Sequence, residues 1–154
     1  MDTKFAYNFW RPREAIHAAD TDGNGETIAD PIWTPLVYIG VHPDYVSQHA
    51  AVGGAAAQVL ADFFGTDDFS FSITTSTAPG GVFRSYASFS QAAEENMNSR
   101  VWLGVHFRTA CEDGRRQGKQ VANYVVDHFL KPIKEHHHPR HHEKKDRHPS
   151  HRAK

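Results

Sequence analysis

Three basic side chains and one histidine stand at spacings that suit the binding of a tetrahedral anion. Lys4 and Arg11 are seven residues apart, or two helical turns, so on one helix they would share a face. Arg100 and His106 are six residues apart and would diverge by about 240° on an unbroken helix, but Gly104 between them offers a break. Three cations could neutralise a trianion such as phosphate or vanadate, and a nearby histidine could bond covalently to its central atom.

A predicted helix start supplies further donors for the same anion. Residues 47–64 (SQHAAVGGAAAQVLADFF) predict a helix with Ser47 as its N-cap and Gly65 as its stop. The backbone amides of Gln48 and His49 should then point outward from the first turn. Free N–H groups and the helix dipole attract anions at such a terminus.

Each of these features also has an ordinary structural explanation when it is taken alone. A lysine and an arginine on one helix face are usually solvated, and a serine before a helix is usually only a cap. A histidine within an apolar run is more often part of the core than a ligand. The anion site therefore depends on the occurrence of these residues together and in order.

The remaining segments predict further helices and one short extended insertion. A helix over 4–17 is ended or kinked by Pro12, because the residue before a proline avoids the helical region. The alternating segment 69–75 predicts a short strand, followed by the loop TAPGG. Ser88 and Gln91 form a capping box that opens a helix through about residue 100.

Small residues indicate how the helices could pack. Gly53 and Gly54 give their helix a slim face that another helix backbone could approach closely. The last predicted helix carries an apolar stripe at three-four spacing, which includes Cys111 and Gly118. Cys111 is therefore expected in the core rather than as a nucleophile. Together these patterns predict an all-α helical bundle with one short hairpin or loop insertion.

The composition predicts one domain over residues 1–133 and a separate tail over residues 134–154. The first part holds 10 Lys/Arg and 15 Asp/Glu, or −5, and the tail holds 7 and 3, or +4. An acidic body argues against a nucleic-acid partner. The His-rich basic tail cannot bury a core and is predicted to be disordered. No signal peptide and no membrane span are apparent in the sequence, and the compartment is not predicted.

A partial calcium motif is interpreted as an ordinary turn. Asp20, Asp22, Asn24 and Gly25 match the opening of a calcium loop of the EF-hand type. The twelfth position of such a loop, where a bidentate glutamate belongs, is Pro31. We therefore expect a turn stabilised by Asp and Asn side chains.

Three ordered segments resemble signatures of the superfamily that unites vanadium-dependent haloperoxidases with acid phosphatases of the phosphatidic acid phosphatase type 2 class. KFAYNFWRP (4–12) resembles the first signature, HPDYVSQHA (42–50) the second and SRVWLGVH (99–106) the third. The resemblance covers roughly residues 4–130 and is greatest to the bacterial haloperoxidase-like branch. It implies the C-terminal part of that family's helical bundle.

The resemblance implies a role for each residue of the anion site. His106 would be the covalent vanadate ligand and His49 the acid or base for hydrogen peroxide. The oxygens of the anion would be held by Lys4, Arg11, Ser47, the amide of Gln48, and Arg100. The implied activity is oxidation of halide by hydrogen peroxide with vanadate as cofactor, and phosphate could occupy the same site. His42 resembles the position where bromoperoxidases carry histidine, which implies that bromide is preferred over chloride.

Two alternatives to the peroxidase remain open at this point. In the phosphatase relatives the same pocket hydrolyses phosphate monoesters, with the equivalent of His106 as nucleophile and that of His49 as proton donor. The other alternative is a truncated or degenerate anion-binding fragment without catalysis.

Departures from the family pattern bear on these alternatives. Val46 and Gln48 replace the usual proline and glycine of the second signature, so the Gln48 side chain could crowd the anion. Ala110 stands where many members carry an aspartate that orients the histidine, and Glu112 or Asp113 could substitute for it. Members normally have many helices before the lysine signature. We therefore expect self-association, or a partner, to cover the missing layer.

Overall fold

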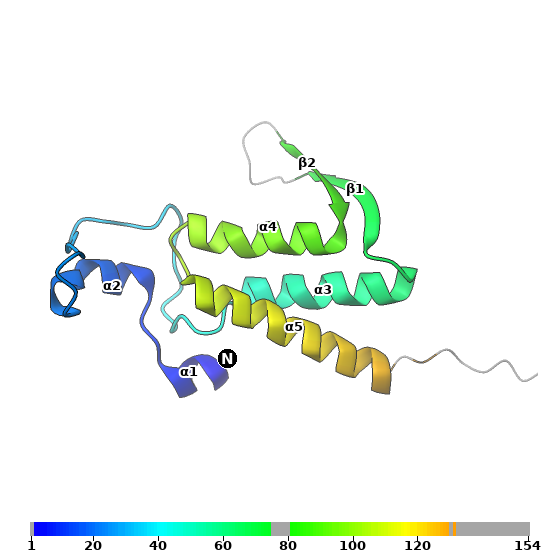
Figure 1. Cartoon of the computed structure of the whole chain (residues 1–154), viewed down its shortest axis with the longest axis horizontal. Helices are drawn as coiled ribbons and strands as arrows, with labels where there is room; N and C mark the ends of the chain where they lie inside the picture. The colour runs from blue at the N-terminus through cyan, green and yellow to red at the C-terminus, as the bar shows by residue number, and fades with distance from the viewer. Residues whose placement is uncertain (1, 75–80, 130, 132–154) are drawn as a thin grey trace, which may run out of the picture.

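The computed structural model describes residues 2–74, 81–129 and 131 (Figure 1). Three long helices, α3 (Gln48–Phe64), α4 (Phe89–Trp102) and α5 (Arg108–His128), lie side by side as a bundle. A two-stranded antiparallel hairpin of β1 (Asp68–Thr74) and β2 (Phe83–Ser88) connects α3 to α4. The segment before the bundle contains the short helices α1 (Asp2–Tyr7) and α2 (Pro12–His17) and the 3₁₀ turn η1 (Ala19–Thr21). The prediction of a helical bundle with a hairpin insertion is confirmed.

The ends of α3 follow from two residues. Ser47 has an extended backbone, and its side chain accepts the amide of Ala50 at 3.5 Å, so it caps the helix as predicted. Gly65 ends the helix in the left-handed conformation, with a φ of 72°, which glycine adopts at little cost. The first turn of α3 therefore begins directly at the segment that carries Ser47 and His49.

Glycines allow α3 and α5 to lie in backbone contact. A β-carbon at Gly118 would lie 1.9 Å from the carbonyl oxygen of Ala51, and one at Gly114 would lie 2.6 Å from that of Ser47. In return, a β-carbon at Gly54 would lie 2.5 Å from the carbonyl oxygen of Arg115. The slim face predicted for α3 therefore packs against α5, and the start of α3 is held close to α5.

The helix α4 begins with the predicted cap. Ser88 accepts the amide of Gln91 at 3.0 Å, and the Gln91 side chain accepts the amide of Ala87 at 2.6 Å. At its base the hairpin joins an aromatic cluster in which the Phe69 and Phe89 rings stack at 5.2 Å. Cys111 is fully buried with Ala50 and Met97, so its expected place in the core is confirmed.

The N-terminal segment differs from its prediction. Instead of one helix over 4–17, α1 and α2 are separate, and Asn8 has a positive φ of 45° between them. Pro12 is the first residue of α2 and not a kink inside a helix, because its fixed φ and missing N–H suit the first helical position. The predicted Asp-rich turn is present: Asp22 accepts the amide of Asn24 at 2.7 Å and so serves its own loop.

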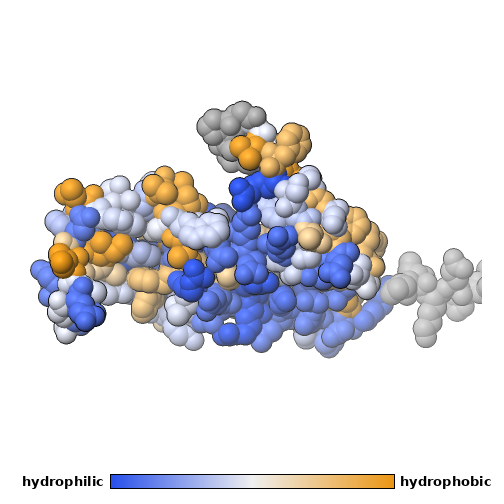
Figure 2. All heavy atoms as spheres, turned by 45° about the horizontal axis from the view of Figure 1, so that its top comes forward, coloured by the Kyte–Doolittle hydropathy of each residue, from blue (hydrophilic) through white to orange (hydrophobic). Residues whose placement is uncertain are grey.

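Large apolar side chains of the N-terminal segment are exposed. Ile32 is 88% exposed and Val41 98% exposed, and Ile28, Leu36 and Tyr38 are also exposed. Figure 2 shows hydrophobic atoms gathered over the side of the molecule formed by this segment. None of the helices within the described residues is long and apolar enough to cross a membrane. The predicted tail, 134–154, lies outside the described residues.

Candidate functional site

Lys4 and Arg11 converge, but not for the reason given by their spacing. They do not share a helix face, because α1 ends at Tyr7 and Arg11 is the N-cap of α2. Both instead point at the loop before α3, where the Lys4 ammonium donates to the carbonyls of Pro43 at 3.1 Å and Asp44 at 2.8 Å. Burial, and next the charge of Arg11, lower the pKa of Lys4 to about 8.

The Arg11 guanidinium ties this loop to the end of α4. Its Nε donates to the carbonyl of His42 at 3.0 Å, and its Nη1 donates to the carbonyl of Val105 at 2.7 Å. Its Nη2 lies 2.9 Å from Nδ1 of His42. Burial lowers the pKa of Arg11, although the guanidinium remains charged. A single buried cation therefore joins segments that are more than 90 residues apart in the sequence.

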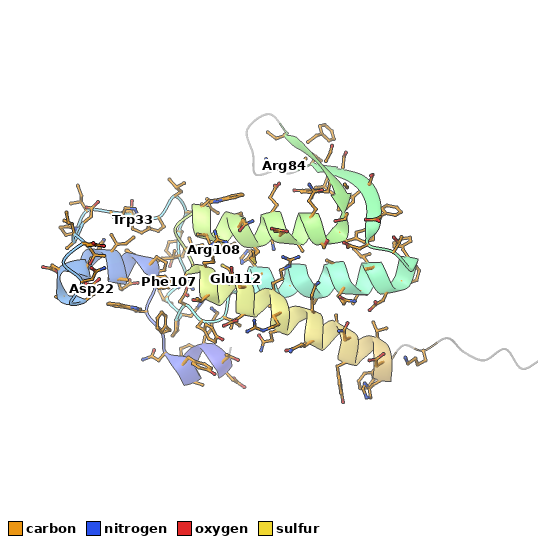
Figure 3. All side chains as sticks on the ribbon, in the orientation of Figure 1. Asp22, Trp33, Arg84, Phe107, Arg108 and Glu112 are labelled. Atoms are coloured by element: carbon orange, nitrogen blue, oxygen red, sulfur yellow. The ribbon has the colours of Figure 1, made fainter. Side chains whose placement is uncertain are left out.

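His106 has a carboxylate partner that was not predicted. Nδ1 of His106 lies 2.6 Å from Oδ1 of Asp44, and both side chains are buried. The substitutes predicted for the missing aspartate were wrong. Glu112 is exposed on α5 (Figure 3), and Asp113 bonds the hydroxyl of Tyr45 at 2.7 Å. Burial, with the charges of Arg11 and Lys4, lowers the pKa of His106 despite the opposing effect of Asp44, so the ring is neutral near pH 7.

The predicted break at Gly104 is confirmed. The helix α4 ends at Trp102, and Gly104 has a φ of 72°. The amides of Val105 and His106 then donate back to the carbonyl of Arg100 at 3.1 and 3.3 Å. This tight corner brings His106 back beside the last turn of α4. A β-carbon at Gly104 would also lie 2.6 Å from the Trp33 ring, so glycine is required here by both conformation and space.

Arg100, His49 and Ser47 complete the charged centre. Nε of Arg100 is buried and has no hydrogen-bond partner among the residues that the structure describes. Partial burial of the His49 ring, then the charges of Arg100 and His106, lower the pKa of His49. Ser47 is fully buried at the start of α3, whereas Gln48 and His49 are exposed. We name the centre formed by Lys4, Arg11, Asp44, Ser47, His49, Arg100 and His106 the cationic cluster.

The cationic cluster fits an anion better than a metal cation. Its three cationic side chains outnumber its one carboxylate, which leaves a net charge of +2 with both histidines neutral. A buried guanidinium nitrogen without a partner, as at Arg100, is a donor that an oxyanion would satisfy. The first-turn amides of α3 add donors and a favourable dipole. Within residues 2–74, 81–129 and 131, no three His, Cys, Asp or Glu side chains are grouped to hold a cation.

His42 lies at the edge of the cluster. Its ring packs over Gly40, where a β-carbon would lie 2.9 Å from Nε2. Because an arginine can only donate, Nδ1 of His42 accepts the hydrogen bond from Arg11. Beside both residues lies an open cavity of about 660 Å³ with walls from Phe5, Phe9 and other aromatic side chains. His42 therefore contacts the cationic cluster on one side and this cavity on the other.

Asp44 and the carbonyl of Val105 are the participants that sequence reasoning missed. The carbonyl of Val105 leaves no signal in the sequence, because any residue supplies one. Asp44 did leave a signal, since it is an acidic residue inside the second signature, three positions before Ser47. Its partner is 62 residues away, so neither local spacing nor helical periodicity could pair the two.

Comparisons with known proteins concern the helical bundle that carries this site. Residues 1–135 match the family described as the VCPO (vanadium chloroperoxidase) second helical-bundle domain. A bacterial vanadium-dependent iodoperoxidase superposes with a TM-score of 0.67 at 38% identity, over 82% of this chain and 28% of that one. An apo-type bacterial vanadium-dependent chloroperoxidase superposes with a TM-score of 0.67 at 24% identity, over 80% of this chain and 31% of that one.

A holo-type structure of a bacterial vanadium-dependent chloroperoxidase superposes with a TM-score of 0.57 at 24% identity, over 69% of this chain and 25% of that one. Comparison with curated proteins finds no significant match. The chain spans less than a third of the length of the solved structures it resembles. Its match over residues 1–135 shows that the chain belongs to the family of the VCPO second helical-bundle domain.

Proposed function

We propose that the cationic cluster binds vanadate and that the chain supports the oxidation of halide by hydrogen peroxide. One observation carries this proposal: the buried Lys4 and Arg11, and Arg100 with its buried Nε, gather beside two histidines, His49 in the first turn of α3 and His106 after the end of α4. The family match supports it. Vanadate, when bound, supplies the electrophilic transfer of peroxide oxygen to the halide.

Each residue of the cluster has a distinct task in this proposal. Lys4, Arg11 and Arg100 hold the oxygens and withdraw charge from them, as do the Ser47 hydroxyl and the Gln48 amide. His106 binds the central atom through Nε2, because Asp44 occupies Nδ1. His49 is neutral near pH 7 and can accept a proton from hydrogen peroxide at its free ring nitrogen.

His42 is proposed to favour bromide over chloride. Its ring lies between Arg11 and the open cavity, so it is placed to affect what approaches the cluster from that side. An imidazole presents a polar edge there, whereas a phenylalanine would present only an apolar ring. The proposal concerns the preference between halides and not the presence of activity.

The decisive experiment compares two arginines. Arg100→Gln removes the buried donor without a partner, whereas Arg108→Gln removes an exposed arginine that bonds Asn98 at 3.1 Å. Vanadate binding is measured by calorimetry and by ⁵¹V resonance, and halide oxidation is measured with and without vanadate. We expect Arg100→Gln to weaken vanadate binding by about 100-fold, since a charged hydrogen bond contributes about 1.5–3 kcal/mol. Arg108→Gln should bind as the parent does.

Two results would contradict the proposal. Equal vanadate affinities in the parent and in Arg100→Gln would show that the anion binds elsewhere. A parent chain that binds vanadate but oxidises no halide would favour the non-catalytic alternative, an anion-binding fragment.

Hydrolysis of phosphate monoesters is a second candidate, and the Asp44–His106 pair favours it. A histidine nucleophile benefits from a carboxylate partner at its other nitrogen, and here it has one at 2.6 Å. Nε2 of His106 would attack phosphorus while the phosphorus–oxygen bond to the alcohol breaks. His49 in its protonated form would donate its proton to the leaving oxygen, which departs as the alcohol. Water would then give a proton to His49 and attack phosphorus, breaking the phosphorus–nitrogen bond and releasing phosphate and free His106. A phosphatase assay on vanadate-free protein distinguishes this reaction from the peroxidase.

The exposed apolar side chains of the N-terminal segment lead to a separate proposal about association. Side chains such as Ile32 and Val41 are almost fully exposed, and contiguous apolar surface of this kind usually marks an interface. We expect the isolated chain to self-associate or to require another polypeptide over this surface. Sedimentation of the purified chain tests this, and a monomer that binds no hydrophobic dye would contradict it.

A further inference from the structure

Asp44 is held in place by every polar group of its backbone. Its N–H donates to the carbonyl of Phe9 at 2.9 Å, and its carbonyl accepts the Lys4 ammonium at 2.8 Å. The residue is fully buried. With its backbone fixed on both sides, the carboxylate has little freedom to turn away from His106.

Within residues 2–74, 81–129 and 131, the carboxylate has one hydrogen-bonded partner. Oδ1 of Asp44 lies 2.6 Å from Nδ1 of His106, whereas Oδ2 is buried and bonds none of these residues. The nearest arginine nitrogen, Nη1 of Arg11, is 4.0 Å from Oδ1 and bonds the carbonyl of Val105 instead. A carboxylate that served only stability would have both oxygens satisfied, because each buried unpaired oxygen costs free energy. The arrangement therefore serves the histidine.

A carboxylate at Nδ1 determines which ring nitrogen carries the proton. In neutral His106 the proton must reside on Nδ1 to bond Asp44, so Nε2 carries the lone pair. The same bond limits rotation of the ring. Both effects prepare Nε2 to bond the central atom of an anion, whether that atom is vanadium or phosphorus.

We propose that Asp44 is the positioning residue of His106, replacing from the loop before α3 the aspartate that is absent at Ala110 of α5. The value of this role to anion binding rests on the proposed function, whereas the tautomer of His106 can be measured without any anion. Ala110 is itself unable to take the role. It is buried, and its carbonyl accepts the amide of Ser47 at 2.9 Å.

The test reads the tautomer of His106 in the full chain by long-range ¹H–¹⁵N correlation of labelled histidines near neutral pH. Signals of His106 are identified by their loss in His106→Gln. The variants are Asp44→Ala, which removes the acceptor, and Asp44→Asn, which keeps one acceptor oxygen and the shape. Asp113→Asn is the matched control, because Asp113 accepts hydrogen bonds from the neighbouring Tyr45 and from Arg116. Circular dichroism shows which variants are folded.

We expect the Nδ1–H tautomer of His106 in the parent and in Asp113→Asn, a shift toward Nε2–H in Asp44→Ala, and an intermediate result in Asp44→Asn. Affinity for vanadate and for phosphate should fall about 10- to 100-fold in Asp44→Ala. An Nε2–H tautomer in the parent, or no change in either Asp44 variant, overturns the proposal. If Asp44→Ala does not fold, Asp44→Asn decides alone. If the tautomer shifts as expected but the parent binds no anion, the positioning role stands and the proposed function fails.

Discussion

In the bundle, α3 and α5 meet through glycines and alanines, with backbone atoms of one helix touching the other. The N-terminal segment is attached differently. There the buried side chains are Lys4 and Arg11, and they bind backbone carbonyls of the loop before α3 and of Val105. Both regions expose large apolar side chains, but the bundle also buries an apolar core that includes Ala50, Met97 and Cys111.

The bundle is therefore stabilised by close packing, whereas the N-terminal segment is attached by the charged groups of the site that we propose. The bundle depends on close packing that has no need of the cationic cluster. Docking of the N-terminal segment, in contrast, uses the same ammonium and guanidinium groups that we propose to bind an anion. Anion binding and the attachment of this segment should therefore be coupled, whereas neither should change the stability of the bundle.

The largest effect should come from the contact between α3 and α5. Gly118→Ala places a methyl group 1.9 Å from the carbonyl oxygen of Ala51, and this neighbour is backbone that cannot move aside. We expect a loss of about 3 kcal/mol in the free energy of unfolding, measured by urea denaturation followed by circular dichroism. Gly25→Ala, where a β-carbon meets nothing within 4 Å, is the control. Equal stability of the two variants would mean that the bundle is not held by this contact.

A smaller effect is expected from the attachment of the N-terminal segment. Lys4→Met leaves the buried carbonyl of Asp44 without its donor and removes one of the donors to the carbonyl of Pro43, at a cost of about 2 kcal/mol. Limited proteolysis should cut the N-terminal segment faster, while hydrogen exchange within α3 and α5 stays unchanged. Arg13→Gln, at an exposed arginine paired with Glu14, should change neither measurement. Faster exchange throughout α3 and α5 in Lys4→Met would show that the two regions unfold together.

The pH dependence of anion binding should show whether Lys4, which attaches the N-terminal segment, also binds the anion. Lys4 has a pKa of about 8, so above that pH the free chain must take up a proton to present a charged ammonium. Phosphate affinity should therefore fall as pH rises through about 8, by about tenfold or 1.4 kcal/mol.

The contribution of Lys4 to the free energy of unfolding changes with pH in the opposite direction. Between about 8 and the ordinary 10.5 the unfolded chain binds more protons, so Lys4 favours folding more as pH rises.

Titration calorimetry of phosphate against pH measures this step. Phosphate itself titrates, so the parent is compared with Lys4→Met, which retains the phosphate titration and lacks the Lys4 step. Parallel curves of phosphate affinity against pH for the two proteins would show that Lys4 does not bind the anion and has only a structural role.

The smallest effect should come from His42, which contacts the cluster only through Arg11. If the chain oxidises halides when loaded with vanadate, His42→Phe should raise the ratio of chloride to bromide oxidation by about threefold, or 0.7 kcal/mol. The ratio is measured with both halides on one preparation, so that partial loading cancels. An unchanged ratio would show that His42 does not affect the halide preference and only supports Arg11.

Local signals predicted the elements of this fold well. Ser47 and Ser88 cap helices, and Gly65 and Gly104 end or break them, because each effect involves residues within a few positions in the sequence. The contacts of Lys4 and Arg11 were not predicted correctly from their spacing. Their seven-residue spacing suggested one helix face, but the chain turns at Asn8, and both side chains reach a loop some 30 to 40 residues away.

The carboxylate partner of His106 could not be predicted from local sequence signals either, because it too is a long-range contact. Whether Asp44, Glu112 or Asp113 meets the histidine depends on the path of the loop before α3, and that path is set by bonds from Phe9 and Lys4. Sequence reasoning named the basic side chains and the histidines that gather in the cationic cluster. It could not identify which carboxylate would be buried among them, since that depends on tertiary contacts.

The corner at Gly104 also provides an optical probe. The Trp33 ring lies against this glycine, and the amide of Leu36 donates to the carbonyl of Leu103 at 3.1 Å, so the loop carrying Trp33 rests on the turn that presents His106. Trp10 and Trp102 are more exposed and can be replaced by phenylalanine, leaving a single fluorophore. Emission from Trp33 would then shift toward longer wavelengths whenever the loop leaves the corner, reporting on the assembly of the site in real time without a bound ligand.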